Sequence, residues 1–151
     1  VWDGKDWIDE NGIKHVSYGI NSIKKCPRRV GIVSQGLITA NSPVTDKLLE
    51  VDYECIIVDE CHRAKRKNLG QNKKHEKANP NNLMKFLLQI SKKTKSMLLA
   101  TATPVQLHPI EAYDLMNILS QKNDSVLGSI FSKWRTDQNK GLDLVMGKES
   151  T

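Results

Sequence analysis

The sequence has no long hydrophobic run and few aromatic residues, and these absences exclude several classes of protein. No stretch approaches the roughly 20 apolar residues that a membrane-spanning helix needs, and aromatic residues make up only 5% of the 151 residues. Residues 1–12 carry acidic side chains where a signal peptide has its apolar core. With 38% hydrophobic residues, the chain can still bury the core of about one globular domain. Because it does not begin with Met, we interpret it as part of a longer protein.

Cysteine is also scarce, and its spacing indicates neither a disulfide framework nor a usual metal site. Cys26, Cys55 and Cys61 are odd in number and form no C-x-x-C pair, so a reduced, cytoplasmic setting is expected. Cys55, Cys61 and His62 do not have the spacing of zinc ligands. A nucleophilic pair of Cys61 and His62 is disfavoured as well, because neighbouring side chains at a strand end point to opposite sides.

Positive charge is concentrated in one segment. The chain carries 23 Lys and Arg against 17 Asp and Glu, a net charge of +6. Residues 63–77 contain a single acid, Glu76, and seven basic residues: Arg63, Lys65, Arg66, Lys67, Lys73, Lys74 and Lys77. This window alone therefore carries the whole excess. Two interpretations stay open, a solvated irregular loop or a segment that attracts nucleic-acid phosphates by counterion release.

Short apolar runs alternate with helical patterns along most of the chain. We expect strands at residues 30–34, 53–60 and 96–104, and helices at residues 42–51, capped by Ser42, 81–95, capped by Asn82, and 109–121, beginning at Pro109. This alternation predicts an α/β fold with a mostly parallel sheet. The predicted organisation is a polar arm at 1–29 with a tight turn at Asn11-Gly12, a domain at 30–135, and a tail at 136–151.

Polar residues follow each predicted strand. Asp59-Glu60 follow the run IIV, Ser34-Gln35 follow VGIV, and Thr101-Ala102-Thr103 follow SMLLA. Because ligands of parallel α/β sheets bind beyond the carboxyl ends of the strands, we expect these three segments to converge along one rim.

The adjacent carboxylates of Asp59 and Glu60 fit a nucleotide-bound Mg²⁺, a cation that takes one or two protein oxygens and retains several waters. They equally fit an ordinary polar strand end. The phosphate-binding G-x₄-G-K-[ST] pattern is absent from the sequence. Gly31 and Gly36 have its spacing, but Leu37 and Ile38 stand where Lys and Ser/Thr are required.

The combination of IVDECH and, about 40 residues later, LLATATPVQ resembles motifs II and III of superfamily 2 helicase-like ATPases. VDYECIIVDECHRAKRKN and LLATATPVQLHPIEAYDLMNIL are similar in detail to the SWI/SNF-related branch of bacterial type, and VGIVSQGLI and FSKW also fit. The resemblance covers residues 28–135. It implies a partial RecA-like, three-layer domain of the P-loop NTPase type.

The resemblance also implies roles for single residues. Asp59 would hold Mg²⁺ through water, Glu60 would activate the hydrolytic water, and His62 would link this site to the coupling segment. That segment comprises Thr101, Ala102, Thr103 and Gln106. Ser34, Gln35 and the basic residues Arg63, Lys65, Arg66, Lys67, Lys73 and Lys74 would lie near nucleic acid. Cys61 is a departure, since the family usually has Ala or Gly there.

The implied function is a part of an ATP-dependent translocase on double-stranded DNA, with ATP and Mg²⁺ as cofactors. The P-loop segment and the second RecA-like lobe of such a protein would lie outside this sequence, so the isolated chain is expected to be inactive and prone to self-association through an exposed sheet edge. The alternatives are a non-catalytic nucleic-acid-binding module that uses residues 63–77 and a metallohydrolase built on Asp59, Glu60 and His62.

Overall fold

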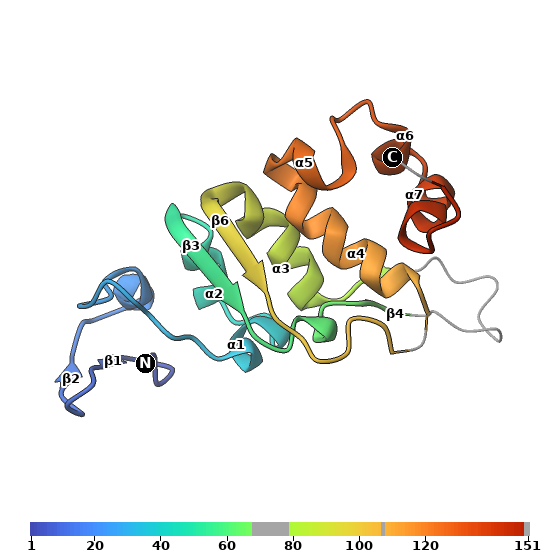
Figure 1. Ribbon diagram of the computed structural model, residues 1–151. Coiled ribbons are helices and arrows are strands. Elements are labelled where there is room, and N and C mark those ends of the chain that lie inside the picture. Colours follow the sequence, from blue (N-terminus) through green and yellow to red (C-terminus); the bar gives the residue numbers. More distant parts are fainter. Residues whose placement is uncertain (68–78, 107, 150–151) are drawn as a thin grey trace. The chain divides into compact units, whose positions relative to one another are not determined.

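A computed structural model describes residues 1–67, 79–106 and 108–149 (Figure 1). The chain divides into two compact units, Val1–Asp52 and Tyr53–Thr151. The boundaries at residues 29 and 135 stay a prediction. Within the first unit, residues 30–52 contact the N-terminal arm: the amide of Trp2 donates to the carbonyl of Ile32 (2.9 Å), and Lys24 pairs with Glu50 (2.6 Å).

The first unit begins with a small hairpin. Strands β1 (Trp7–Ile8) and β2 (Lys14–His15) pair antiparallel, and the predicted turn at Asn11-Gly12 is confirmed, with Gly12 at a φ of 77° that favours glycine. Trp2 and Trp7 are buried edge-to-face, with 5.5 Å between their ring centroids. The indole of Trp7 donates to two carbonyls of the 3₁₀ helix η1 (Ile20–Lys24). The two tryptophans therefore anchor the arm.

The predicted strand at residues 30–34 is wrong. These residues form no strand, and Val30 and Ile32 are 77% and 60% exposed. A strand requires a neighbour that supplies a ladder of hydrogen bonds, and here only isolated contacts such as the Trp2–Ile32 bond are made. Helices α1 (Gln35–Thr39) and α2 (Val44–Leu48) follow, and Pro43 rather than Ser42 occupies the N-cap of α2.

The second unit is mixed α/β and contains a small parallel sheet. Strand β3 (Tyr53–Val58) pairs with β6 (Thr94–Leu99) in a register that places Ile57 beside Leu98. Among the described residues no further strand pairs with either. Figure 1 shows the two strands side by side, with α3 (Asn82–Ile90) and α4 (Ile110–Leu119) beside them. Two of the three predicted parallel strands are thus present.

Helix α3 is shorter than predicted, and its cap is different. Asn81, not Asn82, is the N-cap, and its side chain accepts the amide hydrogen of Met84 (2.9 Å). The helix ends at Ile90, the 3₁₀ turn η4 (Ser91–Lys93) follows, and β6 begins at Thr94. The lysines expected in the last helical turn therefore lie outside the helix, and the apolar stripe of α3 is buried as predicted.

The segment between the strands begins and ends with backbone pairing. The 3₁₀ turn η2 (Cys61–Arg63) precedes β4 (Arg66–Lys67), which pairs antiparallel with β5 (Asn79–Pro80). The start of the basic segment 63–77, for which an irregular loop was one interpretation, thus contains a 3₁₀ turn and a paired strand. Residues 68–78 lie outside the described part of the chain.

The C-terminal part is helical. After α4 come η5 (Ser120–Lys122), α5 (Asp124–Leu127), α6 (Lys133–Thr136) and α7 (Gln138–Val145). Ile110, Tyr113 and Leu127 form a buried cluster against which Trp134 and Leu142 pack. Helix α7 therefore joins the predicted tail at 136–151 to the core of this unit.

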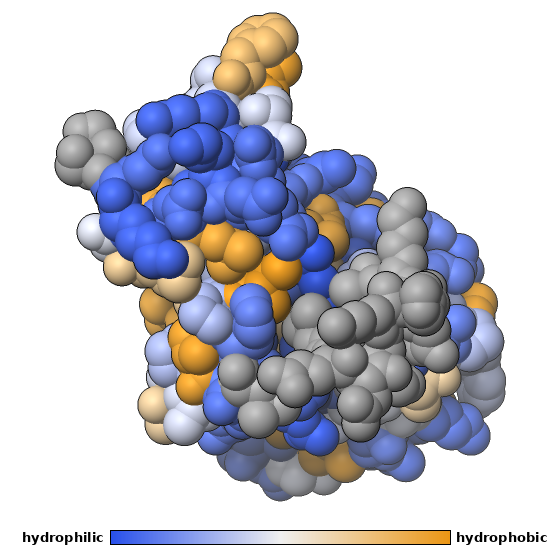
Figure 2. Space-filling model, turned by 90° about the vertical axis from the view of Figure 1, so that its right-hand side faces the viewer, coloured by the Kyte–Doolittle hydropathy of each residue, from blue (hydrophilic) through white to orange (hydrophobic). Residues whose placement is uncertain are grey.

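Several large apolar side chains remain on the surface. In the sheet, Ile57 and Leu98 are 68% and 56% exposed, and Phe131 is 86% exposed. Figure 2 shows hydrophobic residues among mostly hydrophilic ones on one face. Within the described residues, no helix combines the length and the hydrophobicity that crossing a membrane requires.

Candidate active site

The carboxyl ends of β3 and β6 are joined directly. Beyond the strands, the amide of Ala100 donates to the carbonyl of Val58 (2.8 Å), and the amide of Cys61 donates to the carbonyl of Ala100 (3.0 Å). The parallel pairing thus continues into the loops. It places Asp59-Glu60 and Thr101 at the same end of the sheet, as the sequence predicted.

His62 connects these two loops through its side chain. Its Nδ1 lies 2.9 Å from the hydroxyl of Thr101 and 3.1 Å from a carboxylate oxygen of Glu60. A proton on Nδ1 suits this arrangement best, because the Glu60 carboxylate can only accept. Cys61, at the position where small residues are expected, is fully buried beneath the loop, and burial raises the pKa of its thiol.

Glu60 adopts a left-handed backbone conformation, with φ 49° and ψ 43°. Such a conformation costs a non-glycine residue roughly 1–2 kcal/mol. Locally, the carboxylate of Asp59 accepts the amide hydrogen of Glu60 (2.9 Å), and the turn η2 begins at the next residue. Strain held by surrounding contacts is a recurrent feature of functional sites.

The two carboxylates at this rim suit a metal ion that is also bound by the phosphates of a nucleotide and by water. Asp59 and Glu60 are exposed, and no group of three or more His, Cys, Asp or Glu side chains in the described parts of the chain is arranged to hold a metal ion. Mg²⁺ carried by a nucleotide needs only one or two carboxylates, so two adjacent ones fit it. Cys55 is exposed and Cys61 is buried, and together with His62 they do not form such a group within the described residues.

The loop after β6 is held by one of its own side chains and by one from α4. The hydroxyl of Thr101 accepts the amide hydrogen of Thr103 (3.1 Å), and the buried carboxylate of Glu111 accepts that of Gln106 (2.6 Å). Ala102, Thr103 and Gln106 themselves are exposed. Glu111 was missed from sequence, although its place in the first turn of the predicted helix at 109–121 was available as a signal.

The basic residues of the segment after η2 have different surroundings. Arg63 and Lys67 are exposed and Lys65 is half-buried. Arg66 is engaged instead: its guanidinium donates to both carboxylate oxygens of Asp114 (2.6–3.0 Å) and to the side-chain oxygen of Gln138 (2.7 Å). Lys73 and Lys74 lie outside the described residues.

Ser34 and Gln35 belong to the first unit. The hydroxyl of Ser34 accepts the amide hydrogen of Gly36 (3.2 Å) and caps α1, whose first residue is Gln35. The local role of Ser34 is therefore that of a helix cap, which the sequence interpretation had not assigned.

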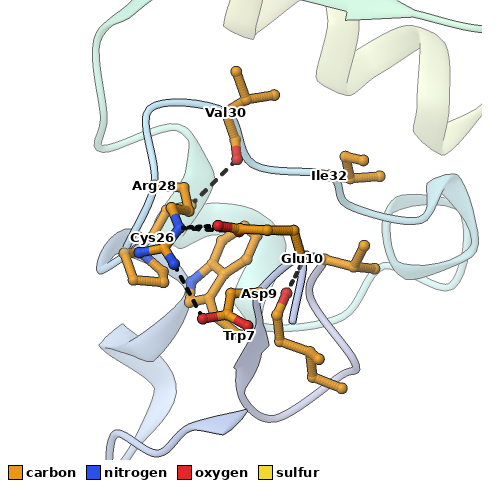
Figure 3. A pocket seen from close by; sticks show the side chains of 10 residues that line it. Trp7, Asp9, Glu10, Cys26, Arg28, Val30 and Ile32 are labelled. Atoms are coloured by element: carbon orange, nitrogen blue, oxygen red, sulfur yellow. Dashed lines mark hydrogen bonds and ion pairs between the residues drawn. The ribbon is translucent and has the colours of Figure 1, made fainter. Parts of the chain in front are cut away.

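Among the described residues, each unit contains a hollow. In the first unit, a pocket of about 190 Å³ lies beside Trp7 and Cys26 (Figure 3), where Arg28 donates to Glu10 (3.0 Å) and Asp9 (3.1 Å). The positive charge of Arg28 in this pocket is thus already balanced by two carboxylates of the same unit. The second, of about 470 Å³, lies at the amino end of β6, at the opposite end of the strand from Thr101. Neither contains a residue predicted to be catalytic.

No family model matches the chain, and neither a curated protein nor a solved structure matches it.

Proposed function

We propose that the chain is part of an ATP-dependent translocase on double-stranded DNA, with a RecA-like fold similar to that of SWI/SNF-related superfamily 2 ATPases. The observation that supports this proposal is the contact of His62 with Glu60 and Thr101 at 3.1 and 2.9 Å. One side chain thereby joins the loop with the two carboxylates to the loop with the threonines. A site that converts hydrolysis into movement requires such a connection between a nucleotide and a mobile loop.

In this proposal each rim residue has one task. Asp59 would hold the Mg²⁺ of ATP through water, and such an ion would supply neutralisation of the charge on the triphosphate. Glu60 orients the attacking water and accepts its proton. His62 contacts both Glu60 and Thr101, so a movement of Glu60 during hydrolysis would shift His62 and, with it, Thr101. The loop 101–106 would then change its position at the DNA-binding surface.

The proposed activity requires parts that this sequence lacks. No G-x₄-G-K-[ST] run is present, so a phosphate-binding segment and a second RecA-like lobe would be supplied by the longer protein. The exposed Ile57 and Leu98 agree with this requirement, because parallel sheets are normally covered on both faces. A cytoplasmic location and self-association of the isolated chain belong to the same proposal.

The test is Glu60→Gln in the full-length protein that contains this chain. ATP hydrolysis stimulated by duplex DNA should be lost while binding of a fluorescent ATP analogue is retained. Glu54→Gln is the matched control, since Glu54 lies on β3, the strand that Asp59 and Glu60 follow, is exposed and pairs across the sheet with Lys95 (2.7 Å). If Glu60→Gln hydrolyses ATP at the wild-type rate, Glu60 has no catalytic role.

A non-catalytic nucleic-acid-binding module is the second candidate, and the exposed Arg63 and Lys67 favour it. It predicts that the isolated chain binds duplex DNA with an affinity that falls steeply with salt. Absence of DNA-stimulated ATP hydrolysis in the full-length protein, together with such binding, would select this candidate over the translocase.

A further inference from the structure

Arg66 lies in the most basic segment of the chain, yet its charge is directed inward. Its side chain is 18% exposed and forms a forked contact with Asp114 on α4, whose side chain is 0% exposed. A further N–H group of the guanidinium reaches Gln138, the first residue of α7 (2.7 Å). N–H groups on three nitrogens, Nε, Nη1 and Nη2, are thus used within the protein, and the forked contact with a carboxylate is one of the strong types of hydrogen bond.

Arg66 and Asp114 form a largely buried ion pair. Burial raises the pKa of Asp114, and the guanidinium of Arg66 opposes this rise. Removing one partner of a buried pair leaves the other charge without compensation, which is far more destabilising than the loss of a surface pair. Arg66 therefore cannot leave Asp114 easily to contact an external phosphate.

The neighbours of Arg66 are directed differently. Arg66 and Lys67 form β4, and consecutive strand side chains point to opposite sides. With Arg66 fixed on α4, the exposed Lys67 is turned to solvent. The backbone before Arg66 is held by Asn81. The side chain of Asn81 donates to the carbonyl of Arg63 (2.7 Å), and its backbone amide donates to the carbonyl of Lys65 (2.9 Å).

We propose that Arg66 is a positioning residue for nucleic-acid binding, and that Asp114 and Gln138 hold it so that Arg63 and Lys67 are presented to phosphates. This inference rests on the nucleic-acid binding common to both candidate functions. It separates the basic segment into residues that contact the ligand and one that orders them. Helix α4 then supports both loops of the site, since Glu111, one turn before Asp114, holds Gln106 (2.6 Å).

The experiment measures binding of the chain to a fluorescein-labelled 20-base-pair duplex by fluorescence anisotropy over a range of NaCl concentrations. Arg63→Gln and Lys67→Gln should each weaken binding and reduce the slope of log K against log salt by about 0.9, the loss of one phosphate contact. Asp114→Asn should also weaken binding, at least about threefold, although it removes a negative charge. Asp143→Asn is the matched control and should bind as well as the wild type or slightly better.

Arg66→Lys gives a second, milder test. A phosphate contact tolerates Lys, whereas a forked contact with a carboxylate does not. The positioning role therefore predicts weaker DNA binding for Arg66→Lys at a temperature where circular dichroism shows the variant to be folded. Wild-type affinity in this variant, or tighter binding by Asp114→Asn, would assign Arg66 to the phosphate contacts and overturn the proposal.

The outcomes also distinguish this inference from the function on which it rests. If the wild-type chain does not bind the duplex even at low salt, nucleic-acid binding and the positioning role fall together. If Arg63→Gln and Lys67→Gln weaken binding while Arg66→Lys and Asp114→Asn do not, nucleic-acid binding stands and the positioning role alone is wrong.

Discussion

The left-handed conformation of Glu60 predicts an inverted preference between glycine and alanine at this position. Glu60→Gly and Glu60→Ala both remove the carboxylate and its 3.1 Å contact with His62, so their difference isolates the backbone. At φ 49° an alanine incurs about 1–2 kcal/mol that glycine avoids. Glycine loses more conformational entropy on folding, roughly 0.5–1 kcal/mol relative to alanine.

The net expectation is that Glu60→Gly is more stable than Glu60→Ala by about 0.5–1 kcal/mol. For a chain of this length that difference corresponds to a melting temperature higher by about 1–4 °C. Urea unfolding followed by circular dichroism measures it. Lys85, exposed within α3, provides the control position, where Lys85→Ala should be more stable than Lys85→Gly by about 1 kcal/mol.

The sign of the difference decides the matter. If Glu60→Ala is as stable as Glu60→Gly or more stable, Glu60 is not held in the left-handed region, and the argument for stored strain at this rim fails. If the inversion is found, two hydrogen bonds maintain the strain: the amide of Glu60 donates to the carboxylate of Asp59, and the amide of Cys61 donates to the carbonyl of Ala100. Neither variant should hydrolyse ATP in the full-length protein under the proposed mechanism.

Two further predictions concern the C-terminal helices. Gly141→Ala should destabilise the chain by about 1–2 kcal/mol in urea unfolding, because an added Cβ would lie 2.2 Å from the ring of Tyr113. Hydrogen bonds from Lys140 and Lys133 lower the pKa of Glu149 from 4.5 to about 2, so their stabilisation is present above about pH 4.5 and is lost as the pH falls towards 2. Thermal unfolding of Glu149→Gln should therefore change less over this acid range than that of the wild type.

Each of these predictions has a matched comparison. Gly36→Ala should be tolerated, because its added Cβ would approach no atom closer than 3.4 Å; equal effects of the two substitutions would contradict the close packing at Gly141. For the acid range, Asp143→Asn is the control, because it replaces a carboxyl on α7, the helix that carries Lys140. A pH profile of Glu149→Gln that coincides with the wild type would remove the two lysines as the cause of the lowered pKa.

The helices were predicted where apolar periodicity and a cap occur together. Helix α4 is found within the predicted range, with Pro109 at its start, because its pattern is local. The boundaries of α3 were less accurate, since Asn81 and Asn82 are equivalent as caps in sequence and differ only in which one reaches the amide of Met84. The strand expected at residues 30–34 shows the limit of this approach, because β-branched residues favour a strand but cannot supply its partner.

In the candidate site, too, local features could be predicted from the sequence and long-range contacts could not. The order of residues in IIVDECH and LLATATP sufficed to predict that two loops follow two parallel strands, because that follows from chain direction and alternation alone. Which basic residue is exposed did not follow: Arg63, Arg66 and Lys67 are alike in sequence, and only the approach of Asp114, 48 residues away, distinguishes Arg66.

Local sequence thus determined the presence of β3, β6, α3 and α4, the acidic and threonine-bearing loops that follow the two strands, and the concentration of positive charge. Tertiary structure alone decided that His62 spans both loops, that Glu60 is held in a left-handed conformation, and that one arginine is turned inward. The physical reason is range: periodicity, capping and turn preferences act over a few residues, whereas these contacts join side chains that are near only once β3, β6 and α4 have packed.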